Sequence, residues 1–328
     1  MPDRGLQAII VVCIVNGLAG LFIALRCICR FAIVKSPGLE DWTLITAMAM
    51  SIVLAVVVDQ QRRYGLGKHA VDVPPEDNTM ILKMLYISVI VYNAGLILVK
   101  FSLLHQYLRF FVERKWRRAD YTIMCIVIGG GISIIFTGIF TCNPIPRFWD
   151  RAGVEGVCIN IQALWYFYAS FNLLTDILCW ALPIPVLAKL VLPSRQKYTL
   201  MFVFTLGLFG CIIGILRMYY LYRATVSTDL TYDNVAAAMW SAIELNVGIV
   251  CACVPALRPV VAKVLPSLVA KTRSWTGTGK RAAGRVELVP EGIRDDQGLV
   301  VRKESGPKWR DLEEGRSEEN ASDAGRST

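Results

Sequence analysis

Seven long apolar stretches, separated by polar loops, constrain this chain more than any other feature. An α-helix rises ~1.5 Å per residue and must cross ~30 Å of hydrocarbon, so each crossing needs about 20 residues. Lipid offers no hydrogen-bond partner to a backbone amide, so the stretches should be helices. The sequence therefore predicts an all-α membrane protein, a seven-transmembrane-helix bundle over residues 1–262. Its crossings are Leu6–Leu25, Trp42–Val58, Ile81–Val99, Tyr121–Thr141, Ala163–Leu182, Leu200–Tyr222 and Val235–Val261.

The composition changes sharply after the last apolar stretch. The whole chain is 55% hydrophobic and only 19% charged, whereas residues 263–328 mix Lys, Arg, Glu, Asp, Gly and Ser. Such a segment cannot bury enough apolar surface to offset the entropy of ordering it. We predict a disordered, mixed-charge cytoplasmic tail over 263–328, which begins with a short interfacial helix at Val264–Trp275.

Lys and Arg are concentrated in every second loop, which predicts the orientation. Positive loops stay on the cytoplasmic side, and this rule places the N-terminus outside. The first stretch lacks a cleavage-site pattern and is predicted to be a retained signal-anchor helix. The net charge of +9 then indicates contact with anionic lipid and not with nucleic acid. We expect the plasma membrane, with an endomembrane as the alternative. The predicted face for a cytoplasmic partner is Arg109, Arg114, Lys115, Arg117 and Arg118.

Charge inside a membrane helix is costly and usually faces a partner or a cavity. The informative charged residues of the predicted helices are Lys100, Asp176, Arg217 and Glu244. Opposite charges at comparable depths predict two pairs, Lys100 with Asp176 and Arg217 with Glu244. Either the pairs only fix helix packing, or one of them rearranges as a switch when the bundle changes state.

Polar amides accompany these charges. Asn172 lies four residues before Asp176, so both side chains share one helix face. With Asn93 or Asn246 opposite, they predict a polar site within the bundle.

Cysteine placement predicts one disulfide. Most of the ten cysteines lie inside predicted helices or on the cytoplasmic side. Cys142 and Cys158 instead lie in a predicted outer loop and bracket residues 143–157. An oxidising compartment would let them form a disulfide, and the alternative is two free thiols.

The motifs of several function classes are missing. The sequence contains no HExxH, no pair of CxxC motifs and no glycine-rich phosphate loop, and its histidines are His69 and His105. This argues against a metal hydrolase, a nucleotide-driven pump or any other enzyme, and it predicts no metal site. Retinal proteins need a Lys in the last helix, and Val235–Val254 contains none. We therefore expect no retinal and no other cofactor.

Several ordered runs resemble the fungal rhodopsin-like integral membrane protein family, over about Arg26 to Pro259. The resemblance implies seven helices with an extracellular N-terminus. Members of the family are receptor-like, and many accompany fungal secondary-metabolite or toxin gene clusters. The runs are Gly38–Trp42, Tyr64–His69, Lys100–Phe111, Cys142–Trp149 with Cys158, Asn172–Asp176, Leu182–Pro185, Leu192–Lys197, and Arg217 with Trp240–Glu244.

Two departures separate the chain from animal receptors of the rhodopsin type. Tyr107–Arg109 replaces their Asp-Arg-Tyr motif, and Val254–Arg258 replaces Asn-Pro-x-x-Tyr, which argues against the same G-protein coupling. We expect a receptor-like protein that senses an extracellular or lipophilic small molecule and signals to a cytoplasmic partner. The alternatives are a carrier or transport accessory, and a non-catalytic scaffold of a secondary-metabolite pathway.

Overall fold

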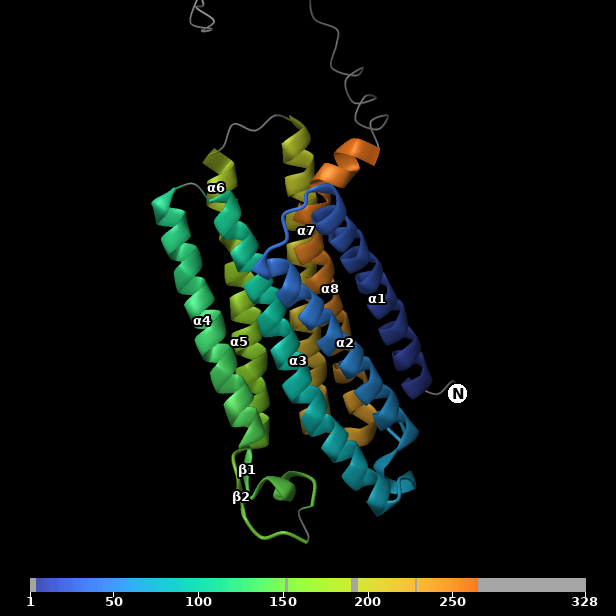
Figure 1. Cartoon of the computed structure of the whole chain (residues 1–328). Coiled ribbons are helices and arrows are strands. Elements are labelled where there is room, and N and C mark those ends of the chain that lie inside the picture. Colours follow the sequence, from blue (N-terminus) through green and yellow to red (C-terminus); the bar gives the residue numbers. More distant parts are fainter. Residues whose placement is uncertain (1–3, 112, 151–152, 190–193, 228, 265–328) are drawn as a thin grey trace, which may run out of the picture. The chain divides into compact units, whose positions relative to one another are not determined.

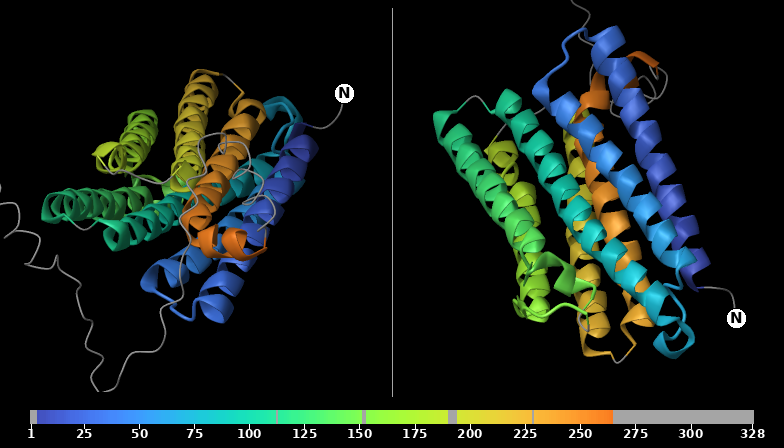
Figure 2. Two further views of the ribbon diagram at one scale, coloured as in Figure 1. Left: turned by 90° about the horizontal axis from the view of Figure 1, so that it is seen from above. Right: turned by 60° about the horizontal axis from the view of Figure 1, so that its bottom comes forward.

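The computed structural model describes residues 4–111, 113–150, 153–189, 194–227 and 229–264. Almost all of the predicted tail, with its interfacial helix, lies outside these residues. The described chain forms a bundle of long helices that run alongside one another (Figures 1 and 2). The helices are α1 Arg4–Cys27, α2 Leu39–Arg63, α3 Pro75–Phe110, α4 Arg114–Ile139, α5 Ile161–Ala181, α6 Ile184–Lys189, α7 Ser194–Val226 and α8 Leu230–Val264.

Short elements connect or extend these helices. A π-helix, η1 Ile28–Ile33, continues α1, and the 3-10 helices are η2 Ala70–Asp72 and η3 Ile145–Phe148. One small antiparallel sheet joins β1 Cys142–Asn143 to β2 Val157–Cys158, between α4 and α5.

Six of the described helical segments are long and apolar enough to cross a membrane. Each of them overlaps one of the predicted crossings, so six of the seven predictions are matched. The remaining one, Leu200–Tyr222, is helical within α7, but α7 is not among the six. The protein is thus a multi-pass helical membrane protein, while the seventh crossing and the outside N-terminus stay predictions. The six segments are Arg4–Ile33, Leu39–Arg63, Pro75–Arg109, Arg114–Ile139, Ile161–Val186 and Thr231–Leu257.

Local sequence explains where the helices begin. Pro75 occupies the first turn of α3, where a missing amide hydrogen does no harm, and Glu76 and Asp77 follow it at the positive end of the helix. The predicted crossing Ile81–Val99, which follows apolar residues alone, lies within this longer helix. The side chain of Asn160 caps α5 by accepting a hydrogen bond from the Ala163 amide at 3.2 Å.

The bundle has two distinguishable ends. The disulfide end contains the Cys142–Cys158 bond, which forms as predicted and closes the loop around η3. The basic end contains the α3–α4 connection and the exposed residues Arg114 and Lys115. Between the ends, α8 packs against α7, α1, α3 and α2. The main apolar core lies among α1, α2, α3 and α8, around Leu44, Leu245 and Ile249.

Candidate functional site

Two ion pairs cross the middle of the bundle and join four helices. The ammonium of Lys100 on α3 lies 3.1 Å from Oδ1 of Asp176 on α5. The guanidinium Nη1 of Arg217 on α7 lies 3.5 Å from Oε2 of Glu244 on α8. Lys100, Arg217 and Glu244 are buried, at 5%, 8% and 5% exposed. The structure thus brings together the residues that the sequence paired by depth.

The Lys100 side chain is fully hydrogen-bonded. Besides its ion pair, its ammonium donates to the Asn172 carbonyl oxygen at 2.9 Å and to Thr175 Oγ1 at 2.7 Å. An ammonium has three donors, so Asp176, Asn172 and Thr175 together satisfy all of them. This pair therefore fastens α3 to α5.

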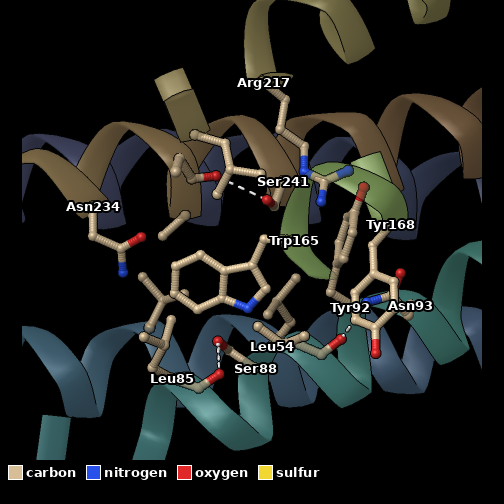
Figure 3. A pocket seen from close by; sticks show the side chains of 15 residues that line it. Leu54, Leu85, Ser88, Tyr92, Asn93, Trp165, Tyr168, Arg217, Asn234 and Ser241 are labelled. Carbon is tan, nitrogen blue, oxygen red and sulfur yellow. Dashed lines mark hydrogen bonds between the residues drawn. The ribbon is translucent and has the colours of Figure 1, made fainter. Parts of the chain in front are cut away.

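The Arg217 pair is looser and includes a tyrosine. The Tyr92 hydroxyl donates to Glu244 Oε2 at 2.7 Å. The Arg217 guanidinium lies 4.3 Å from the centre of the Tyr92 ring, and Figure 3 shows these two side chains next to each other. The 3.5 Å separation of Arg217 from Glu244 exceeds the ~2.7–2.9 Å of a good charge-assisted hydrogen bond. The second carboxylate oxygen of Glu244, Oε1, accepts no hydrogen bond within the described chain.

Of the two amides predicted to face Asn172, the structure selects Asn93. Asn172 Nδ2 donates to Asn93 Oδ1 at 3.1 Å. The Asn246 side chain on α8 bonds to α2 instead: its Oδ1 accepts a hydrogen bond from the Ser51 hydroxyl at 3.0 Å. Depth alone could not separate the two amides, since the rotation of each helix decides which side chains meet.

Two small cavities flank the ion pairs. The Trp165 cavity, toward the disulfide end, has a volume of about 60 Å³ and is lined by Arg217, Asn93 and Trp165, with apolar walls (Figure 3). The Lys100 cavity has a volume of about 90 Å³, and its lining includes Lys100, Asp176 and Glu244. The two partners of the Arg217–Glu244 pair therefore line different cavities.

A larger hollow lies beside the disulfide loop. The Arg147 hollow, about 530 Å³, is lined by residues that include Arg147, Cys158 and Gln162. Trp165 lines both this hollow and the Trp165 cavity. Trp165 therefore borders both spaces.

A second ionic cluster lies at the basic end, and sequence analysis missed it. The fully buried carboxylate of Glu40 lies 2.8 Å from Arg109, 3.1 Å from His105 and 3.4 Å from Arg30. Acidic residues at the start of a helix are usually solvent-exposed, so the sequence provided no reason to expect that Glu40 is buried. The spacing of His105 and Arg109, four residues apart on one helix face, was the available indication.

Arg109, a member of the predicted partner face, takes part in this cluster: its guanidinium lies 2.8 Å from the buried Glu40 carboxylate, while its side chain is 37% exposed. The other four members are also exposed, namely Arg114, Lys115, Arg117 and Arg118. The face for a cytoplasmic partner stays a prediction.

The helix bundle and its buried ion pairs define a multi-pass helical membrane protein with charged residues beside internal cavities. Comparison with known families is more specific. The model of the fungal rhodopsin domain matches residues 25–263, and the chain belongs to that family. No solved structure matches the chain.

Several curated relatives are 24–30% identical to this chain over the aligned residues. Satratoxin biosynthesis SC1 cluster protein 4 of Stachybotrys chartarum is 30% identical over 187 residues, 56% of this chain and 68% of that protein. A SAT4 family membrane protein of Emericella nidulans is 30% identical over 230 residues, 69% of this chain and 55% of that protein. Receptor GIN3 of Arthrobotrys oligospora is 24% identical over 308 residues, 89% of this chain and 74% of that protein.

Proposed function

We propose that this protein is a membrane receptor that binds a small molecule inside its helix bundle and signals to a cytoplasmic partner. The observation that carries the proposal is the Arg217–Glu244 pair, which joins α7 to α8 while its two members line different cavities. A ligand shifts a conformational equilibrium only by its differential affinity for two states. A buried pair held at 3.5 Å offers such a difference, because a ligand can compete for one partner.

Helix α3 supplies the connection between the ligand site and the basic end. It carries Tyr92 and Lys100, which contact Glu244 and Asp176. Further along the same helix, within 17 residues of Tyr92, it carries His105 and Arg109, which contact Glu40 on α2. A rotation or shift of α3 that follows rearrangement at Tyr92 therefore acts on the Glu40 cluster beside the partner face.

Access to the site fits the proposed orientation. We place the N-terminus and the disulfide end outside the cell, with the plasma membrane as the location. A ligand then arrives through the Arg147 hollow and passes Trp165, which lines both spaces. Receptor GIN3, which aligns with 89% of this chain, is a relative whose name supports the receptor assignment.

Gene deletion in the source organism tests the proposal. Deletion should abolish a transcriptional response to an extract of culture medium, and the wild-type gene should restore it. Arg217→Lys should restore it weakly, because an ammonium cannot lie over Tyr92 and reach Glu244 as a planar guanidinium does. Arg223→Lys, the matched change at an exposed position of the same helix, should restore it fully. A response that survives deletion would refute the receptor assignment.

The second candidate is a non-catalytic membrane component of a secondary-metabolite pathway, either a transport accessory or a scaffold. The names of three relatives favour it, since they are biosynthesis cluster proteins for satratoxin, polyenoic acids and wortmanamides. A transport role requires that Asp176→Asn or Glu244→Gln alter the distribution of a labelled metabolite across the membrane. A scaffold tolerates both changes as long as the bundle folds.

A further inference from the structure

The four charges in the middle of the bundle cancel. Lys100 and Arg217 balance Asp176 and Glu244, and each pair is in contact. Any additional charge in this interior lacks a counter-ion and loses its hydration, which is strongly unfavourable. A charged ligand therefore binds here only if something compensates its charge.

Arg217 has unused capacity to bind an anion. A guanidinium carries five N–H donors, and Arg217 makes one long ion pair, at 3.5 Å, within the described chain. Its side chain is 10% exposed and lines the Trp165 cavity. In Figure 3 the guanidinium lies above the Tyr92 ring, on the side of the cavity where Asn93 and Tyr168 also lie. A planar guanidinium matches a carboxylate with two parallel hydrogen bonds.

Glu244 is the group that loses a partner if an anion takes Arg217. Its Oε2 would keep the Tyr92 hydroxyl, while its Oε1 already accepts no hydrogen bond within the described chain. The other charged or titratable groups around it come from α3, α5, α7 and α8. On the α1 and α2 side, Ser51 contacts Asn246 of α8 and does not titrate, and nearer the basic end Arg26 and Cys29 donate to the Ala252 and Ala256 carbonyl oxygens of α8. The titratable groups around Glu244 and the Lys100 cavity are Tyr92, Lys100, Tyr107, Asp176, Cys179, Cys211, Arg217 and Cys251.

We propose that the Trp165 cavity binds the carboxylate of a small organic acid through Arg217, and that Glu244 takes up one proton when the acid binds. This inference rests on the binding site of the proposed function and names its ligand class. One carboxylate anion and one proton enter together: the Glu244 carboxylate forms one O–H bond, and a hydronium ion or buffer acid in the solvent gives up the proton. The net charge of the site stays zero, and protonated Glu244 can donate a hydrogen bond.

The cavity restricts the size of the acid. A volume of about 60 Å³ holds a carboxylate and a few carbon atoms. The apolar side chains of Leu54, Leu85 and Leu221 line the cavity and provide contact for a short alkyl chain. A longer acid would have to displace Trp165 toward the Arg147 hollow.

Calorimetry with two isosteric probes tests the proposal on the full chain in lipid nanodiscs. Butyrate and butyramide have the same shape, but only butyrate is an anion. We expect butyrate to bind at least tenfold more tightly than butyramide near pH 6. Titrations in buffers of different ionisation enthalpy should show uptake of one proton per butyrate, and the affinity should fall about tenfold per pH unit once Glu244 is ionised in the free protein.

Variants separate the role of Glu244 from binding of neutral butyric acid. Glu244→Gln mimics the protonated carboxyl, so it should bind butyrate without proton uptake and with little dependence on pH. Glu113→Gln, the matched change at an exposed position, should behave as wild type. Arg217→Gln should lose the preference for butyrate over butyramide. If that variant fails to fold, Arg217→Lys should retain the preference with weaker binding.

Each contrary outcome is distinct. Equal binding of the two probes, or binding of neither, would overturn the organic-acid assignment. Proton uptake that persists in Glu244→Gln would show that another group, or the acid itself, carries the proton. None of these results touches the transcriptional response of the deletion strain, which decides the receptor assignment separately.

Discussion

The carboxylate of Glu40, fully buried at the start of α2, lies 2.8 Å from the guanidinium of Arg109 at the end of α3. His105, one turn earlier on α3, and Arg30 on η1 contact the same carboxylate. The Ser102 hydroxyl donates to the Glu40 carbonyl oxygen at 2.7 Å. Helices α2 and α3 are therefore tied together at the basic end, next to the exposed cations of the α3–α4 connection.

Gly38→Ala should weaken this tie. A Cβ added at Gly38 would collide with the side chains of both Arg109 and Glu40. The backbone there has φ −136°, which alanine adopts freely, so the effect is steric and not conformational. We expect a loss of about 1–3 kcal/mol in the free energy of unfolding, measured by thermal denaturation in detergent.

The double variant provides the control. In an Arg109→Ala background one of the colliding side chains is gone, so Gly38→Ala should then cost clearly less. If the losses in the free energy of unfolding were strictly additive, Gly38→Ala would not act through the Glu40–Arg109 contact.

Arg26→Leu should be among the most destabilising single changes. Arg26 is 2% exposed; its Nε lies 2.8 Å from Asp41 Oδ1, and its Nη1 donates to the Ala252 carbonyl oxygen at 2.5 Å. Its removal leaves the carboxylate of Asp41 buried with the more distant Arg30, at 3.8 Å. We expect a loss of about 3–5 kcal/mol in thermal or denaturant unfolding. The change Asp41→Asn in the same chain should recover part of it, and a double variant no more stable than Arg26→Leu would contradict this account.

The membrane class and the two central ion pairs were predictable from sequence for one physical reason. A charge at mid-membrane depth needs a partner, and few candidates exist at the same depth. The pairs predicted by depth, Lys100 with Asp176 and Arg217 with Glu244, are therefore the pairs that are in contact in the bundle.

Features that depend on helix rotation or on helix ends were not predictable in the same way. The sequence left Asn93 and Asn246 as equal candidates to face Asn172, and only the rotation of α3 and α8 separates them. At the basic end, Glu40 lies where water is near, so composition suggested exposure. Its burial follows from the close approach of α2 to α3, which no local pattern encodes.

Loss of the disulfide should destabilise the loop at the disulfide end. Cys142 and Cys158 are separated by 16 residues, and their bond closes this loop. Closing a loop of that length is worth about 3 kcal/mol in the chain-entropy model. We expect Cys142→Ser to lower the unfolding temperature and to leave Cys158 open to labelling by a maleimide without reductant. Labelling of Cys158 in the unreduced wild type would contradict the bond.

The exposed basic residues should matter for signalling and not for folding. Arg114 and Lys115 are exposed at the start of α4. A double change to alanine should therefore leave unfolding within about 0.5 kcal/mol of wild type. If the α3–α4 connection meets the cytoplasmic partner, the same change should abolish the transcriptional response with surface expression intact. An undiminished response would place the partner elsewhere.

Three consecutive glycines in the middle of α4 provide an internally controlled test of helix packing. An added Cβ at Gly130 would collide with the Phe171 ring on α5, and one at Gly131 with the Ile97 side chain on α3, whereas one at Gly129 meets nothing within 4 Å. Gly129→Ala should therefore be neutral or stabilise by up to about 1 kcal/mol, since alanine favours the helix. Gly130→Ala and Gly131→Ala should each cost about 1–3 kcal/mol in thermal unfolding, because their neighbours must move. Equal effects at all three positions would mean that helix propensity, and not the approach of α4 to α3 and α5, decides the stability here.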